Sequence, residues 1–313
     1  MKIRMTPRMA VSLLIAAILA ASFCPGSSAA GETRYVPFKL SRNRVIIPTQ
    51  INGSRPLSLI LDTGLRFDGV YLFSKELAKE IDMTGAIEVR VPGAGSGEAS
   101  AAQMIESGTL AFGEVTVDSQ RVIISQSART QGFPTDGIIG WNLFGHYTVE
   151  IDYDLERITL HDTTALHLDS TWTSLPIVLR KDLPFLECRV EVVKGETVPV
   201  TVYIDLASGD ALELLVKPDQ KFSMPDSLKS AYLGTGLSGD INGSVGRSEH
   251  LWVGEFTLSD IRTAFAPAEV RSKQQGADGI LGNDCIRRFN VIFDYAHKQL
   301  RVRPSKYFAV PFE

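Results

Sequence analysis

From about residue 35 onward, the chain alternates short apolar runs with glycine, proline, asparagine and aspartate. Runs rich in valine, isoleucine, leucine and aromatic residues that end at such breakers are typical of strands joined by turns. We expect strands in the first half at 44–47, 57–61, 69–73, 117–125, 147–153 and 157–161. We expect strands in the second half at 175–179, 185–192, 199–204, 212–216, 261–265, 289–295 and 299–302. The pattern therefore predicts an all-β protein.

Helical pattern is sparse. The strongest candidate is 74–81, where Ser74 stands in the N-cap position ahead of charged and apolar residues. Two further short helices are expected at 142–144 and 283–287, each directly after a glycine-terminated apolar run. Helices are therefore expected to be few and short.

The two halves of the chain repeat one pattern. Residues 136–140 read Asp-Gly-Ile-Ile-Gly, and residues 278–282 read Asp-Gly-Ile-Leu-Gly. An aspartate inside an apolar run precedes each phrase by a matching distance: Asp62 lies 78 positions before the last glycine of the first phrase, and Asp205 lies 77 before that of the second. An offset of about 142 residues is too long for a solenoid repeat and suits two domain-sized lobes. We place the lobes at 31–165 and 170–313.

The shared aspartates carry the candidate chemistry. An ionised carboxylate in an apolar strand is costly to bury without partners. Beside Asp62, the hydroxyl of Thr63 and the backbone N–H of Gly64 can provide hydrogen bonds. Because two equivalent halves can bring their two carboxylates together, the duplication favours a paired-carboxylate site, which is a known catalytic arrangement.

An apolar run into Asp62-Thr63-Gly64, followed some 75 residues later by apolar-apolar-Gly, resembles the retropepsin/pepsin superfamily of aspartic proteases. The resemblance is strongest to bacterial exported members that carry two retropepsin-like lobes in one chain, and it covers roughly residues 35–303. It implies two homologous β-barrel lobes with a cleft between them. It also implies that Asp62 and Asp205 are the catalytic pair.

The resemblance assigns further residues. Thr63 and Gly64 would support the first aspartate, and Leu206, Ala207 and Ser208 would support the second. The second lobe departs from the family, because Leu206-Ala207 stands where Thr/Ser-Gly is usual. Without a hydroxyl on residue 206, the symmetric threonine clasp beneath the pair cannot form, and the Ser208 hydroxyl is expected to replace part of it. The following glycines would lie in flaps over the substrate: Gly93, Gly95, Gly97, Gly236 and Gly239.

The expected function is that of an aspartic-type endopeptidase, a hydrolase that activates water between Asp62 and Asp205. The alternative is a non-catalytic peptide-binding or regulatory protein on the same fold, which the Asp205-Leu206-Ala207 motif motivates. A peptide or protein is the expected substrate. No cofactor or metal is expected, because the five histidines are scattered and none pairs with a Cys or His at metal-ligand spacing. A formal Gly234-x-Gly236-x-x-Gly239 match lacks the strand–helix context of nucleotide binding.

The ends and composition bear on location. Three basic residues precede an apolar run at 10–23, and small residues at 28–30 suit a cleavage site, so residues 1–30 are expected to be a signal peptide of a periplasmic or secreted protein. Its removal changes the formal charge from −4 to −7, because it holds three basic and no acidic residues. An acidic chain is not suited to nucleic acid. After cleavage we expect no membrane span, and we expect a monomer, because both lobes are in one chain. Cys188 and Cys285 could form a disulfide or remain buried thiols.

Overall fold

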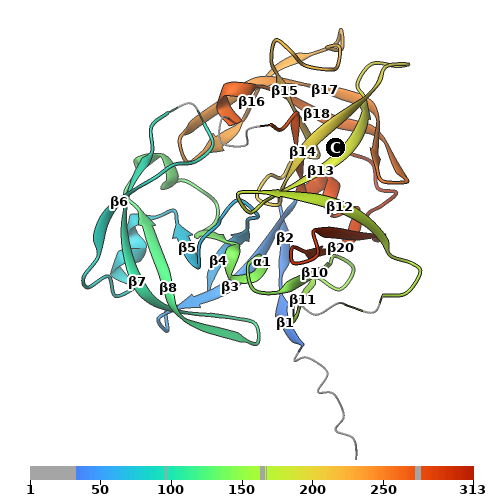
Figure 1. The fold of residues 1–313 in the computed structure, drawn as a ribbon. Coiled ribbons are helices and arrows are strands. Elements are labelled where there is room, and N and C mark those ends of the chain that lie inside the picture. The colour runs from blue at the N-terminus through green and yellow to red at the C-terminus, as the bar shows by residue number, and fades with distance from the viewer. Residues whose placement is uncertain (1–32, 96, 163–165, 167, 272–275) are drawn as a thin grey trace, which may run out of the picture. The chain divides into compact units, whose positions relative to one another are not determined.

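The computed structural model of the chain describes residues 33–313 except 96, 163–165, 167 and 272–275 (Figure 1). The predicted signal peptide lies outside the described residues. The described chain is built from strands with a few short helices, as the sequence pattern predicted. None of the helices in this part of the chain is long and apolar enough to cross a membrane.

The first lobe is a six-stranded barrel with two added strands. Successive pairing closes the barrel in the order β3 (Arg44–Ile51), β4 (Leu57–Leu61), β9 (Gly137–Ile139), β5 (Gly69–Leu72), β8 (Val115–Ser125), β7 (Ser100–Phe112) and back to β3. The barrel is extended at its two ends by β2 (Lys39–Ser41) and β6 (Ile87–Val91). Because β3 pairs with β7, neither β3 nor β7 is a free edge of the barrel.

The second lobe repeats the same barrel. Its ring runs β13 (Leu183–Glu191), β14 (Thr197–Asp205), β19 (Gly279–Gly282), β15 (Leu212–Val216), β18 (Phe256–Pro267), β17 (Gly239–Val253) and back to β13. Strand β16 (Lys229–Gly236) extends β17 as β6 extends β7. Strand β13 occupies the place of β3, β14 that of β4, and so on for each strand of the ring. The sequence repeat therefore corresponds to a structural duplication.

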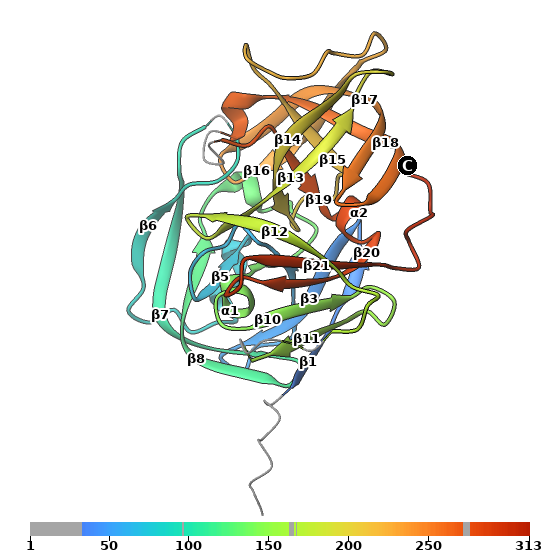
Figure 2. The ribbon, with the colours of Figure 1, turned by 45° about the vertical axis from the view of Figure 1, so that its right-hand side comes forward.

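A sheet shared by the two halves joins the lobes (Figure 2). Its strands follow in the order β1 (Arg34–Pro37), β11 (Arg157–His161), β10 (Thr148–Asp152), β20 (Phe289–Asp294), β21 (Gln299–Pro304) and β12 (Thr173–Arg180). The central pair is antiparallel, with Val149 opposite Phe293. The halves are therefore hydrogen-bonded to each other through their backbones, and both lie within the compact unit Gly31–Glu313.

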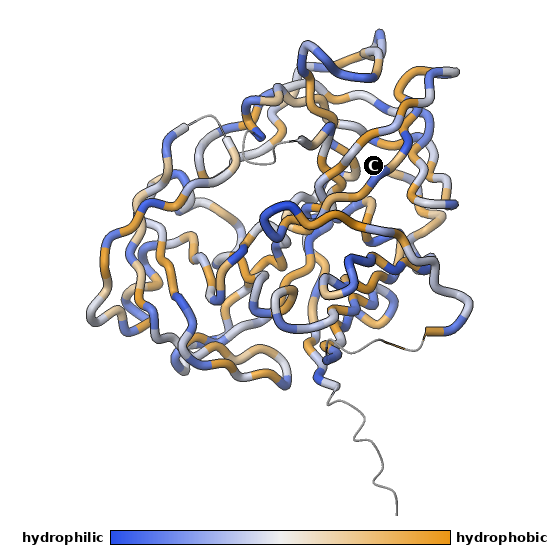
Figure 3. The backbone as a smooth tube through the Cα atoms, viewed as in Figure 1, coloured by the Kyte–Doolittle hydropathy of each residue, from blue (hydrophilic) through white to orange (hydrophobic). Residues whose placement is uncertain are grey.

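The strands that carry the two aspartates bury both of their faces. Hydropathy changes over short intervals along the chain (Figure 3). On β14, Val202 and Ile204 point into the large core that extends through both lobes, whereas Tyr203 points into a smaller cluster on the opposite face. On β4, Leu61 likewise joins the large core and Ile60 joins a third cluster. Since side chains alternate along a strand, each aspartate continues the face of the smaller cluster in its lobe.

The helices differ slightly from the prediction. The segment expected at 74–81 is a 3₁₀ helix, η1 (Lys75–Lys79), and the Ser74 hydroxyl accepts a hydrogen bond from the Glu76 N–H at 3.3 Å. The short helices after the glycine phrases are α1 (Trp141–Phe144) and α2 (Asn283–Ile286). Two more 3₁₀ turns are η2 (Ala128–Thr130) and η3 (Ala268–Arg271).

Two long hairpins, β6–β7 and β16–β17, were largely missed from sequence. Strand β7 has 13 residues and β17 has 15. Both are rich in serine, glycine and other polar residues, so they lack the alternating apolar pattern that identified the other strands. Most of the glycine-rich stretch 234–243 therefore lies in strands, and only its middle forms the hairpin tip.

Candidate active site

Each aspartate stands where a barrel strand ends against its glycine phrase. The Asp62 N–H donates to the Ile139 carbonyl oxygen at 2.8 Å, and Asp205, the last residue of β14, lies opposite Gly282 in the parallel pair β14–β19. A Cβ atom on Gly140 would lie 2.0 Å from the Asp62 carbonyl oxygen. The glycine that closes the first phrase is therefore required for the close approach of the Asp62 backbone.

Backbone N–H groups of the following residues hold both carboxylates. The Gly64 N–H donates to Oδ1 of Asp62 at 2.6 Å. The N–H groups of Ala207 and Ser208 donate to Oδ1 of Asp205 at 3.0 and 3.2 Å. Ser208 thus supports the carboxylate through its backbone; among the described hydrogen bonds its hydroxyl accepts from the Asp210 N–H at 3.4 Å, instead of contacting the carboxylate as expected.

A one-sided threonine clasp joins the two aspartate loops. The Thr63 hydroxyl donates to the Ile204 carbonyl oxygen at 2.7 Å and accepts from the Leu206 N–H at 3.3 Å. The Leu206 side chain cannot return these bonds, and it is fully buried in the large core. The loss of symmetry predicted from the sequence is therefore confined to one of the two halves of the clasp.

The two carboxyls interact electrostatically. Burial and the nearby charge of Asp205 raise the pKa of Asp62 to about 7, although the hydrogen bond from the Gly64 N–H acts in the opposite direction. Burial also raises the pKa of Asp205, while the positive charge of Arg271 opposes that shift. Raised pKa values caused by burial and a neighbouring carboxylate are typical of paired catalytic acids.

A buried ion pair lies near Asp205. The guanidinium of Arg271, at the end of η3, binds both carboxylate oxygens of Glu213 on β15 at 2.7 and 2.9 Å. Their side chains are 10% and 2% exposed. Arg271 also favours charge on Asp205, whereas Glu213 opposes it. The pair therefore makes the two carboxyls electrostatically unequal, and nothing in the sequence pattern indicated it.

The first hairpin of each lobe supports the aspartate loop of the other lobe. Asn43, in the turn between β2 and β3, donates to the Gly209 carbonyl oxygen at 3.2 Å, and Arg44, the first residue of β3, donates to the Ala207 carbonyl oxygen at 2.6 Å. From the opposite direction, Arg66 donates to the Lys181 carbonyl oxygen in the β12–β13 turn at 2.9 Å. Each aspartate loop is thus positioned by both lobes.

The predicted flap stretches contact each other. The Ser238 N–H donates to the Ala94 carbonyl oxygen at 2.8 Å, and the Gly97 N–H donates to the Ser238 carbonyl oxygen at 2.6 Å. The Gly93 N–H donates to the Ser238 hydroxyl at 3.0 Å. A Cβ on Gly236 would lie 2.2 Å from the Ala94 carbonyl oxygen, so this close approach requires a glycine. The two hairpin tips are therefore joined in this structure.

Comparison with known proteins agrees with this geometry. Residues 47–143 match the family described as Aspartyl protease. A solved structure, the aspartic proteinase from Irpex lacteus, superposes with a TM-score of 0.57 at 13% sequence identity, and the match covers 89% of this chain and 99% of that one. A search of curated proteins found no match. The chain is retropepsin/pepsin-like. Both the family resemblance and the two-lobed all-β fold predicted from the sequence are thereby confirmed.

Apolar clusters flank the two aspartates of this pepsin-like chain. In the first lobe the cluster includes Ile60, Phe73 and Ile138, and Leu237 of the opposite hairpin tip packs against it. The corresponding cluster of the second lobe includes Phe185, Tyr203 and Ile280, and Ala94 of the first hairpin tip packs against it. Each hairpin tip therefore reaches the wall of the opposite lobe.

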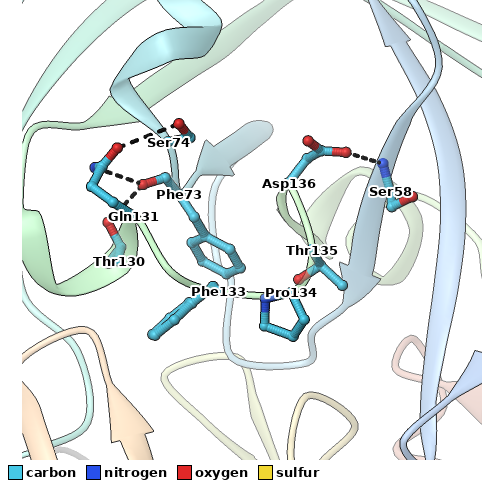
Figure 4. Close-up of a pocket in the computed structure, with 9 residues that line it drawn as sticks. All are labelled: Ser58, Phe73, Ser74, Thr130, Gln131, Phe133, Pro134, Thr135 and Asp136. Carbon is cyan, nitrogen blue, oxygen red and sulfur yellow. Dashed lines mark hydrogen bonds between the residues drawn. The ribbon is translucent and has the colours of Figure 1, made fainter.

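The aspartates that open the two phrases have structural contacts. The Asp136 carboxylate accepts from the Ser58 N–H at 2.8 Å and beside it lies a pocket of about 170 Å³ (Figure 4). The Asp278 carboxylate accepts equivalently from the Thr201 N–H at 3.0 Å and from Lys217 at 2.9 Å. Both carboxylates anchor the strand that leads to the candidate aspartate, Asp62 or Asp205, in their own lobe.

The remaining candidate groups lie away from the pair. Cys188 and Cys285 are buried free thiols in this structure. Among the described residues, no group of three or more His, Cys, Asp or Glu side chains could hold a metal ion. The residues that sequence reasoning missed are Arg44, Glu213 and Arg271, because their roles depend on contacts between segments far apart in the chain.

Proposed function

We propose that this chain is an exported aspartic endopeptidase that hydrolyses peptide bonds with a water molecule activated between Asp62 and Asp205. The observation that carries the proposal is a pair of buried carboxyls at equivalent strand ends of two duplicated lobes. Burial raises the pKa of both, and the charge of Asp205 raises that of Asp62 further. The family match of the first lobe and the pepsin-like fold support the same class of reaction.

Two close carboxyls cannot both ionise easily, so one proton is shared between them. Arg271 favours charge on Asp205, and the pKa of Asp62 is raised to about 7, so Asp205 is the better base and Asp62 the better acid. Asp205 removes a proton from the water as the oxygen attacks the peptide carbonyl carbon, and Asp62 gives its proton to the carbonyl oxygen. Collapse of the tetrahedral intermediate returns a proton to the leaving nitrogen and breaks the C–N bond.

The substrate proposed from the site is an extended peptide segment with apolar side chains on both sides of the cleaved bond. The two apolar clusters support this, because each lies on the aspartate-bearing face of its own lobe. The hairpin tips must separate to admit such a segment, because they are hydrogen-bonded to each other.

The test uses the purified protein with a library of unstructured peptides from about pH 3 to pH 8. Mass spectrometry in ¹⁸O-water identifies cleaved bonds and the oxygen atom added to the new carboxylate. We expect wild type to cleave, Asp62→Asn and Asp205→Asn to lose activity, and Asp152→Asn to retain it. Asp152 is a matched control because its carboxylate accepts from the Asp154 and Leu155 N–H groups in a turn. Persistent cleavage by both dyad variants would overturn the assignment.

The second candidate is a peptide-binding or regulatory protein, favoured by one specific observation, the missing hydroxyl on Leu206. It predicts that wild type binds library peptides, as measured by calorimetry, without cleaving them at any pH. Export and a monomeric state also belong to the proposal. They are tested by N-terminal sequencing of the protein recovered from the periplasm or medium, where the first residue should follow Ala30, and by light scattering.

A further inference from the structure

Tyr203 is a third polar side chain on the aspartate-bearing face of the second lobe. It stands two residues before Asp205 on β14, so both side chains project from the same face of the strand. The equivalent position in the first lobe, two residues before Asp62, is Ile60. Tyr203 is only 1% exposed and its ring packs near Phe185 with centroids 5.9 Å apart. At this pair of equivalent positions, a hydroxyl is therefore present in the second lobe only.

The Tyr203 hydroxyl reaches across to the aspartate loop of the first lobe. Its oxygen lies 3.5 Å from the Thr63 hydroxyl oxygen. It also lies 2.9 Å from the position that a Cβ atom on Gly64 would occupy, and Oδ1 of Asp62 lies 3.0 Å from that same position. The phenol oxygen is thus beside the Asp62-Thr63-Gly64 turn and close to the Asp62 carboxylate.

The available hydrogens decide which group is the donor. Thr63 has one hydroxyl hydrogen, and it is directed to the Ile204 carbonyl oxygen at 2.7 Å. A hydrogen bond between the two hydroxyls must therefore use the hydrogen of Tyr203. Burial and the charges of Asp205 and Asp62 raise the pKa of Tyr203, so the phenol keeps this hydrogen.

We propose that Tyr203 is a positioning residue that supplies, from the strand of the second lobe, the hydroxyl that Leu206 lacks. It holds the Asp62-Thr63-Gly64 turn from across the lobe boundary by donating its one hydrogen to the Thr63 hydroxyl. The catalytic consequence rests on the proposed function, but the effect on the Asp62 carboxyl does not.

Several charged or titratable groups surround this hydroxyl. Asp62 and Asp205 interact with it most strongly, and Tyr295, which follows β20, adds a smaller contribution. Arg271 on η3 also interacts with Tyr203, and Glu213 on β15 neutralises much of that positive charge. Since none of these groups is altered when Tyr203 is replaced by phenylalanine, a shift in the titration of Asp62 reports the hydroxyl itself.

The experiment compares wild type, Tyr203→Phe and a matched control, Tyr147→Phe. The control also removes one partly buried hydroxyl that has a hydrogen-bond partner, since Arg34 donates to it at 3.0 Å. Tyr147 stands directly before β10, which belongs to the sheet that joins the lobes. Asp carboxyl carbons are titrated by ¹³C NMR, with Asp62 assigned by its loss in Asp62→Asn. Without the bond to Thr63, the turn that directs the Gly64 N–H at Asp62 is held less firmly, and the Asp62 anion is less favoured. The pKa of Asp62 should therefore rise by about one unit in Tyr203→Phe and stay unchanged in Tyr147→Phe.

Kinetics provide a second measurement. On the best library peptide, Tyr203→Phe should lower kcat about tenfold with little change in KM, and the alkaline limb of the pH profile, which reports the general acid Asp62, should move to higher pH. Introducing Leu206→Thr into Tyr203→Phe should recover part of the loss if a hydroxyl at the lobe boundary is what matters. An Asp62 pKa that does not change in Tyr203→Phe overturns the inference. Absence of wild-type cleavage would instead count against the proposed function and leave the NMR result to decide the role of Tyr203.

Discussion

The Thr63 hydroxyl offers the sharpest test of how the lobes are joined. It lies between two fully buried residues, donating to the carbonyl of Ile204 and accepting from the N–H of Leu206. Thr63→Val keeps the shape of the side chain and removes both interactions. Each backbone group left without a partner costs about 1–3 kcal/mol, so we expect the free energy of unfolding to fall by about 3 kcal/mol.

Urea unfolding followed by tryptophan fluorescence measures this loss. With a slope of about 3 kcal/mol per molar urea, the midpoint should fall by roughly 1 M. Thr63→Ser is the matched control, because it keeps the hydroxyl and loses only a methyl group, and it should cost no more than about 1 kcal/mol. Equal destabilisation by the two variants would refute the reasoning, because it would assign the cost to packing and not to the clasp. A Thr63→Val midpoint within error of wild type would refute it too.

Three other substitutions have defined outcomes. The pKa of Asp62 is raised to about 7, so between about pH 4 and pH 7 the folded state holds a proton that the unfolded state has released, and the free energy of unfolding should fall as pH rises through this range. Urea titrations at several pH values should show a smaller fall for Asp62→Asn. An unchanged dependence of the unfolding free energy on pH would contradict the raised pKa. Glu213→Gln leaves Arg271 buried without its partner, so we expect about 3 kcal/mol of destabilisation and an acid limb moved to lower pH; a thermodynamically neutral variant would show that the pair is unimportant. Gly236→Ala places a methyl group against the Ala94 carbonyl and should speed amide exchange at Ser238 about tenfold, whereas unchanged protection would mean that the tips do not meet in solution.

The sequence predicted those features that repeat within each half. The apolar runs located β4 and β14, and the matched distances to the glycine phrases identified Asp62 and Asp205 as equivalent. These are local patterns, so a single chain reveals them. The 3₁₀ form of η1 and the length of β7 depend on neighbouring strands, and propensity alone indicates neither.

The contacts between the two halves could not be predicted from the sequence. The bonds of Arg44 to Ala207 and of Arg66 to Lys181 join residues more than 100 positions apart, and they depend on how the two barrels meet. Tyr203 was included only as part of an apolar strand, since nothing in its neighbourhood shows that its hydroxyl crosses to Gly64. The sequence showed that residue 206 lacks a hydroxyl, but it did not show that the Tyr203 hydroxyl lies beside the Asp62-Thr63-Gly64 turn.

The central pairing of the shared sheet also constrains how the protein is made. Strand β10 has β20 as its partner, and about 140 residues separate them in the chain. At synthesis rates of about 5–20 residues per second, β10 has no partner on that side for roughly 7–28 seconds after it emerges. An unpaired strand edge is a template for pairing with other chains. The duplicated architecture thus exposes the nascent first half to aggregation during a defined interval, and slower translation of the second half would lengthen that interval.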